Sequence, residues 1–217
     1  TVHGSSVSGG EPLLQLVGEG SGAWKLAVRS SANVSGALIV NSDASQGNDI
    51  FADMSAKDGG GNTGWHFGSL IQVWTGGVNK DFCTAGNWDP AFMPGPTSRV
   101  TIVATDITLA SPVTVENLAL GDGVATASMT VNAALGVKDS LDVRGNATLT
   151  ANKPIVVTNL FAVREGATVK HTSGSATQAN KIDVYAGGAF LLERGGSVTA
   201  SECGYSGNRN STNAPHG

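Results

Sequence analysis

The amino-acid sequence predicts an all-β protein, specifically a right-handed parallel β-helix with rungs of about 20 to 23 residues. Similar segments begin at Leu118, Leu141, Phe161 and Ile182, which lie 23, 20 and 21 residues apart. Within these segments apolar and polar residues alternate, as in strands with one buried face. The 30 glycines supply turns between strands, and no window has the apolar spacing of an amphipathic helix.

The first half of the chain has compatible but less regular strands. Residues 24–29 and 37–42 alternate between apolar and polar side chains, and residues 58–64 form a glycine-rich loop. We therefore expect irregular β-helical rungs over residues 1–67. A junction rich in Trp, Gly and Pro is expected to follow over residues 68–98.

Regular rungs are predicted over residues 99–201, with a polar, Gly- and Asn-rich tail over 202–217. In each rung a turn and an alanine follow the first strand. The second strands are residues 146–149, 166–169 and 188–191, and the third strands are 155–157 and 197–199.

If each rung makes one turn, equivalent strands stack in parallel about 4.8 Å apart. This stacking predicts two interior ladders, Leu141–Phe161–Ile182 and Val143–Val163–Val184. A β-sandwich also has short strands and Gly turns, but it does not predict that residues about 20 apart match in type.

Composition excludes several functional classes. The net charge is −4 with only 13 Lys and Arg, so no basic stripe is available to neutralise nucleic-acid phosphates. No apolar run of about 18 residues is present to form a transmembrane segment. The first residues, 1–4, lack the features of a secretion signal. Either a signal has been removed or, as we expect, the sequence begins within a longer protein.

Several segments resemble parts of large bacterial extracellular proteins, the adhesin-like and autotransporter-like surface proteins with right-handed parallel β-helix repeats. One segment reads NSDAS at 41–45 and GGNTGW at 60–65. Another reads WTG at 74–76 and GNW at 86–88, before Pro94. A composition low in Lys and rich in Thr, Asn and Gly is similar to that group. The resemblance implies a location outside the cell or on its surface.

The function expected from this resemblance is structural. The chain would be a subunit or segment of a bacterial extracellular filament, sheath or cell-surface protein, acting by stacking and self-association. Its partners would be itself or other surface-protein domains. An adhesin or carbohydrate-binding β-helix module that recognises cell-surface glycans is the alternative. A fragment of a polysaccharide lyase or hydrolase is the third possibility.

Catalytic, cofactor and metal residues are not predicted. The motifs of pectinase-like and pectate-lyase-like enzymes are absent, and Asp142 and Asp183, placed on equivalent positions about two rungs apart, form no convincing acid–base pair. The four histidines have no metal-ligand spacing, and Asp-Gly loops lack the repeated carboxylates of a calcium site.

One predicted surface feature is a possible ligand surface formed by Arg144, Arg164 and Tyr185, which the rung alignment places in register. Two stacked arginines repel each other unless an anion lies across them, and Tyr offers a flat face to a sugar. The favoured alternative is that solvent screens the pair.

The remaining predictions concern core residues and cysteines. Trp74 and Trp88 flank the junction and are expected to cap or pack the core where two stretches of coil meet. Cys83 and Cys203 either form a disulfide or remain two separate thiols, since sequence alone does not determine the pairing.

Overall fold

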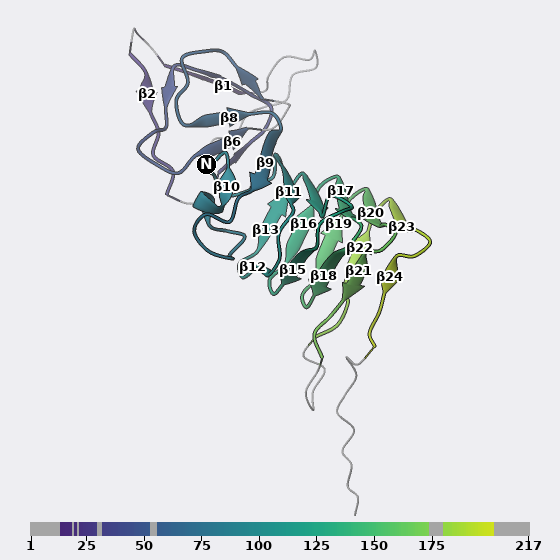
Figure 1. The fold of residues 1–217 in the computed structure, drawn as a ribbon. Coiled ribbons are helices and arrows are strands. Elements are labelled where there is room, and N and C mark those ends of the chain that lie inside the picture. The colour runs from purple at the N-terminus through teal and green to yellow at the C-terminus, as the bar shows by residue number, and fades with distance from the viewer. Residues whose placement is uncertain are drawn as a thin grey trace, which may run out of the picture.

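The computed structural model describes residues 14–18, 20, 22–29, 32–52, 56–173 and 180–201. The described chain is all-β with mostly parallel strand pairing, which confirms that part of the predicted fold class. The strands form two successive stacks (Figure 1), and the predicted junction, residues 68–98, contributes strands Leu70–Trp74 and Trp88–Asp89 to the second stack. No helix in the described part is long and apolar enough to cross a membrane.

The first stack contains three small sheets with parallel pairing. Its core includes Ile39 and Ile50, and the indole Nε1 of Trp65 donates a 2.9 Å hydrogen bond to Ser42 Oγ inside it. The sheets are β1 (Leu14–Val17), β4 (Ala37–Val40) and β7 (Lys57–Asp58); β2 (Trp24–Lys25) and β5 (Ser42–Asp43); and β3 (Asn33–Val34), β6 (Ile50–Ala52) and β8 (Trp65–Phe67).

The second stack is larger and is built from three sheets that the chain visits in turn. The first sheet is β10 (Trp88–Asp89), β9 (Leu70–Trp74), β11 (Ser98–Ile102), β14 (Asn117–Leu120), β17 (Ser140–Val143), β20 (Leu160–Val163) and β23 (Ala189–Leu192). The second is β12 (Ile107–Leu109), β15 (Ala127–Val131), β18 (Ala147–Ala151), β21 (Thr168–Lys170) and β24 (Ser197–Val198). The third is β13 (Val113–Val115), β16 (Leu135–Val137), β19 (Ile155–Val157) and β22 (Val184–Ala186).

Strand register in the second stack agrees with the predicted repeat as far as residue 170. Leu118 pairs with Leu141 and Leu141 with Phe161, and all three are buried. Thr148 likewise pairs with Thr168 in the second sheet. Apolar side chains therefore line the interior at intervals of about one rung, because residues in matched strand positions point to the same face.

The predicted register of the next rung is wrong. Phe161 pairs with Phe190, not with Ile182, and Val184 pairs with Ile155 in the third sheet. The partner in each sheet is 29 residues ahead at this rung, because extra residues separate β21 from β22. As a result Ile182 and Val184 are only partly buried, at the edge of the core.

Two further strand assignments shift with this register. Residues 188–191, predicted as a second strand, overlap β23 of the first sheet, and residues 197–199, predicted as a third strand, overlap β24 of the second sheet. The predicted tail, 202–217, lies outside the described residues.

Polar side chains also stack at the corners between sheets. Asn152 Nδ2 donates to Asn132 Oδ1 at 2.9 Å, and Thr172 donates from its backbone and hydroxyl to Asn152 Oδ1. At another corner, Asn117 and Asn159 both donate to the carboxylate of Asp139. These ladders satisfy polar groups where the chain turns, and they hold successive rungs in one register.

Candidate interaction surface

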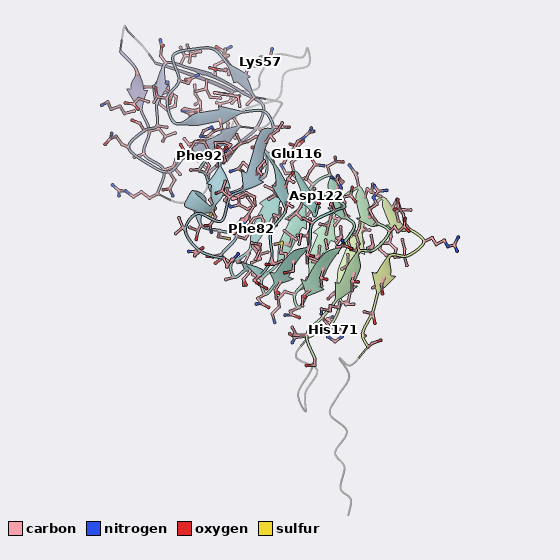
Figure 2. All side chains as sticks on the ribbon, viewed as in Figure 1. Lys57, Phe82, Phe92, Glu116, Asp122 and His171 are labelled. Carbon is pink, nitrogen blue, oxygen red and sulfur yellow. The ribbon has the colours of Figure 1, made fainter. Side chains whose placement is uncertain are left out.

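The end of the second stack nearest the first is closed by aromatic side chains. Phe82, Trp74 and Trp88 are all buried in its core, and Phe82 is labelled in Figure 2. The ring of Trp88 packs edge-on against both others, with centroids 5.1 Å from Trp74 and 4.9 Å from Phe82. Its indole Nε1 donates a 2.8 Å hydrogen bond to the Phe82 carbonyl, so the ring is fixed.

Two buried amides hold the covering loop in place. Gln72 pairs with Val100 and therefore points inward, where its Nε2 donates to the carbonyls of Phe92 at 2.8 Å and Pro90 at 3.2 Å. Asn87 Oδ1 accepts hydrogen bonds from the amides of Val78 and Asn79. This end is therefore built as a cap, with polar groups directed at the loop backbone.

The other end of the second stack exposes apolar side chains. Phe190, Leu191 and Leu192 on β23 are 52%, 37% and 47% exposed. Their register partners one rung earlier, Phe161, Ala162 and Val163, are 2%, 0% and 0% exposed. Equivalent positions are thus covered on one rung and uncovered on the next, because no described segment packs over β23.

The last described strand of each sheet in the second stack has a free edge. β22, β23 and β24 are the outermost strands of their sheets, and in the described part no further strand pairs with them. Free edges of parallel strands present unpaired backbone N–H and C=O groups that can bind another strand. Exposed leucines lie beside this edge and make it a candidate interaction surface, which we call the end surface (β22, β23 and β24).

The predicted arginine surface is a charged corner of different composition. Arg164 donates to Asp142 Oδ1 at 2.8 Å and to Glu193 Oε1 at 2.7 Å, and Arg144 donates to Asp142 Oδ2 at 2.8 Å. The carboxylates that balance the arginines therefore come from the chain itself. Hydrogen bonds from Arg164 and from the amide of Glu165 lower the pKa of Glu193. In return, the carboxylates of Asp142 and Glu193 raise the pKa of Arg164.

Tyr185 is not part of this corner. It pairs with Val156 in the third sheet, and its side chain is exposed there. Glu193 occupies the position predicted for Tyr185. Its backbone amide donates to the Val163 carbonyl, just as the amide of Arg164 donates to the Val143 carbonyl one rung earlier. The same register change separates Asp183, which pairs with Lys181 at 2.9 Å, from Asp142. The alignment therefore misplaced both residues.

The other candidate groups are dispersed. Cys83 is half-buried, with Sγ 3.8 Å from the Ser111 carbonyl, and burial raises the pKa of its thiol. Cys203, its predicted alternative partner, lies outside the described residues. Among the residues that the structure places, no three His, Cys, Asp or Glu side chains gather closely enough to hold a metal ion.

Sequence reasoning missed the residues that define the two ends. Gln72 and Phe82 were not recognised as cap residues, Phe190 and Leu191 were assigned to the wrong strand, and Leu192 was assigned to none. The available signal was the apolar run Phe190-Leu191-Leu192, which lacks the alternation of a strand with one wet face.

Comparison of the chain with protein-family models, with curated proteins and with solved structures gives no match.

Proposed function

We propose that this chain is a right-handed parallel β-helical segment of a bacterial extracellular filament, sheath or cell-surface protein. Its role is structural: the end surface stacks on a further coil, and the resulting rod is stiff because each rung binds its neighbours along its whole length. The partner is another copy of the chain or another surface-protein domain.

The order in which the chain visits the sheets supports the β-helical assignment. Strands β14, β15 and β16 pair in turn with β17, β18 and β19, so each circuit returns to the same sheets one step further along. Each return is a parallel crossover within one sheet, and such crossovers are right-handed in nearly all proteins. The corner ladder of Asn132, Asn152 and Thr172 repeats with the same period.

The observation that carries the structural role is the difference between the two ends of the second stack. One end is covered by Phe82, Trp74 and Trp88, whereas β23 exposes Phe190, Leu191 and Leu192. Full burial of a large apolar side chain contributes about 1.5–3 kcal/mol, and covering these half-buried side chains contributes roughly half of that for each. A partner rung that covers the end surface recovers this free energy and pairs the free strand edges as well.

The extracellular setting is supported by composition and by the resemblance of residues 41–45 and 60–65 to bacterial surface proteins. Apolar exposed side chains at a strand edge also favour a constitutive assembly over a transient contact, because a free edge of this kind leads to aggregation unless a specific partner covers it.

Sedimentation velocity of the 217-residue chain over a range of concentrations tests this role. We expect concentration-dependent association, with rods joined end to end in negative-stain images. Leu192→Glu places a carboxylate on the end surface, and it should shift the association to higher concentration by at least about tenfold, since a buried unpaired charge is costly. Val156→Glu is the matched control, because Val156 is equally exposed but lies on the side of the stack.

The effects of the two substitutions on association decide whether the end surface is the stacking contact. Association that responds to Leu192→Glu and not to Val156→Glu supports stacking through the end surface. A monodisperse monomer at every concentration, or association that both variants weaken equally, would contradict the structural role.

A further inference from the structure

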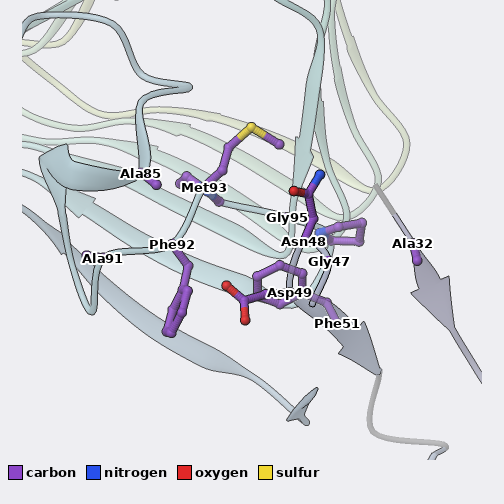
Figure 3. Close-up of a pocket in the computed structure, with 12 residues that line it drawn as sticks. Ala32, Gly47, Asn48, Asp49, Phe51, Ala85, Ala91, Phe92, Met93 and Gly95 are labelled. Atoms are coloured by element: carbon purple, nitrogen blue, oxygen red, sulfur yellow. The ribbon is translucent and has the colours of Figure 1, made fainter. Parts of the chain in front are cut away.

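A pocket of about 380 Å³ lies between the first stack and the junction segment (Figure 3). On one side are residues 47–49, which lead into β6, with Phe51 of β6 itself, and on the other side are residues 91–96. Its volume falls in the range of small-molecule sites. The pocket is separate from the end surface, so its occupancy is independent of the stacking proposed above.

Apolar and aromatic groups form most of the pocket wall. Phe51 lies on one side and Phe92 on the other (Figure 3), and Met93 and Pro94, which follow Phe92 in the chain, also line the pocket. Gly95 approaches Phe51 closely: a Cβ at position 95 would lie 3.5 Å from the Phe51 ring, in ordinary contact. The junction segment is thus packed against β6, and the wall is formed by residues from both parts of the chain.

Asp49 is the one charged residue among those lining the pocket. In the described part of the chain its carboxylate accepts no hydrogen bond, and its nearest basic neighbour is His66, whose Nε2 lies 3.4 Å from Oδ1 and also has no hydrogen-bond partner there. The His66 ring is fixed between Phe51 and Phe92, with centroids 5.2 Å and 4.2 Å away. His66 therefore occupies one side of the Asp49 carboxylate, and the other side is available to a ligand.

These features select the charge of the occupant. A carboxylate beside apolar walls attracts a cation more strongly than it would in bulk water, because the local dielectric constant is lower. The faces of nearby aromatic rings attract the same cation. An anionic ligand is repelled by Asp49, and a neutral apolar ligand covers the carboxylate without supplying a positive charge that offsets its desolvation.

We propose that this pocket binds an organic ammonium group carried on a short apolar chain. The ammonium pairs with Asp49, and the chain packs against Phe51, Phe92 and Met93. A free alkylamine and a lysine side chain of another protein present this same chemistry, and the two sources differ in whether amide groups flank the apolar chain.

Isothermal titration of the 217-residue chain with n-butylammonium tests the proposal, with n-butanol as the uncharged probe of equal length. We expect n-butylammonium to bind and n-butanol to bind at least about tenfold more weakly. Asp49→Asn keeps the shape of the side chain but removes the charge, and it should weaken n-butylammonium binding by a similar factor. Asp106→Asn is the matched control, because Asp106 is an exposed carboxylate outside the pocket.

A second probe and a second variant complete the test. Stronger binding of N-acetyl-lysine methylamide than of n-butylammonium indicates a lysine side chain as the natural ligand, and the reverse order indicates a free amine. Phe92→Leu keeps an apolar wall but removes a ring, and it should also weaken binding of both cations. Equal binding to wild type and Asp49→Asn, each with an unchanged circular dichroism spectrum, would overturn the proposal, as would equal binding of n-butanol.

Discussion

At the scale of single residues, the charged corner shows how the chain neutralises its own stacked cations. Arg144 and Arg164 occupy equivalent positions on successive rungs, where like charges repel. Asp142 accepts hydrogen bonds from both of them, and Glu193 accepts one from Arg164. Arg164 therefore links three successive rungs, from Asp142 through its own position to Glu193, which gives the corner a structural role.

Replacing Arg164 should destabilise the stack more than replacing Arg144. Arg164→Met breaks bonds to two carboxylates, whereas Arg144→Met breaks one. Because the groups are partly exposed, we expect a loss of only about 0.5–1 kcal/mol for Arg164→Met and a smaller loss for Arg144→Met. Urea unfolding at low and high salt measures both, and a larger effect of Arg144→Met would contradict the geometry.

A pH effect should arise at Asp139. Hydrogen bonds from Asn159 and Asn117 lower the pKa of this carboxyl group in the folded protein. Its contribution to stability is therefore fully present above the pKa of the unfolded state, about 3.9, and is lost as the pH falls through the lower folded-state pKa. Asp139→Asn should lower the free energy of unfolding at pH 7, with the difference from wild type shrinking below pH of about 4.

Thermal unfolding from pH 7 to pH 2 measures this difference. Asp122→Asn provides a comparison, because the pKa of Asp122 is also lowered but its hydrogen bonds come from the backbone amides of Val124 and Ala125 within its own turn. A stability difference between wild type and Asp139→Asn that is constant across this pH range would exclude the proposed linkage.

At the scale of strands, the sequence predicted register only where rung length is nearly constant. Leu118, Leu141 and Phe161 could be aligned because 23 and 20 residues separate them and each begins a triplet of two large apolar residues with a small or polar residue between them. Ile182-Asp183-Val184 has that pattern too, but three alternating residues are too short a signal to identify a strand. A longer connection before β22 therefore moved the true partner of Phe161 to Phe190.

The candidate site was predictable to a smaller extent. The two tryptophans at the junction were assigned to the core from size and position, and the structure places both inside it. Gln72 was not predictable, because a buried amide is specified by the carbonyls of residues 90 and 92, which are distant in sequence. Predicting the charged corner requires knowing that Glu193 is the partner of Arg164, and that pairing depends on the long connection before β22.

The interior ladder leads to a prediction about two phenylalanines in contact. Phe161 and Phe190 are register partners with ring centroids 5.3 Å apart, but Phe161 is buried and Phe190 is half exposed. Phe161→Ala should lower the free energy of unfolding by about 3–5 kcal/mol, because it leaves a cavity in a packed core. Phe190→Ala should cost clearly less in the monomer, and chemical denaturation of both variants measures the difference.

At the scale of the whole molecule, the two stacks have separate cores. Ile39, Ile50 and Trp65 belong to the first, and the larger core runs from Trp74 to Val169 in the second. In stacked architectures each rung contacts only its neighbours, so stability is a sum of local terms and falls toward an uncovered end. The central rungs of the second stack have neighbours on both sides, whereas among the residues that the structure describes β23 and β24 pair on one side.

Hydrogen exchange should therefore vary along the second stack. Amides of β17 and β18, which lie between paired strands, should exchange slowest, and those of β22, β23 and β24 should exchange fastest among the strands of this stack. If the end surface is where copies stack, raising the protein concentration should slow exchange in β23 and β24 selectively, because a partner rung then covers them. Leu192→Glu should remove this concentration dependence and leave β17 and β18 unchanged. If higher concentration slowed amide exchange equally along the whole stack, or only in β19, which contains the control position Val156, the contact would lie elsewhere. Either result would contradict end-to-end stacking.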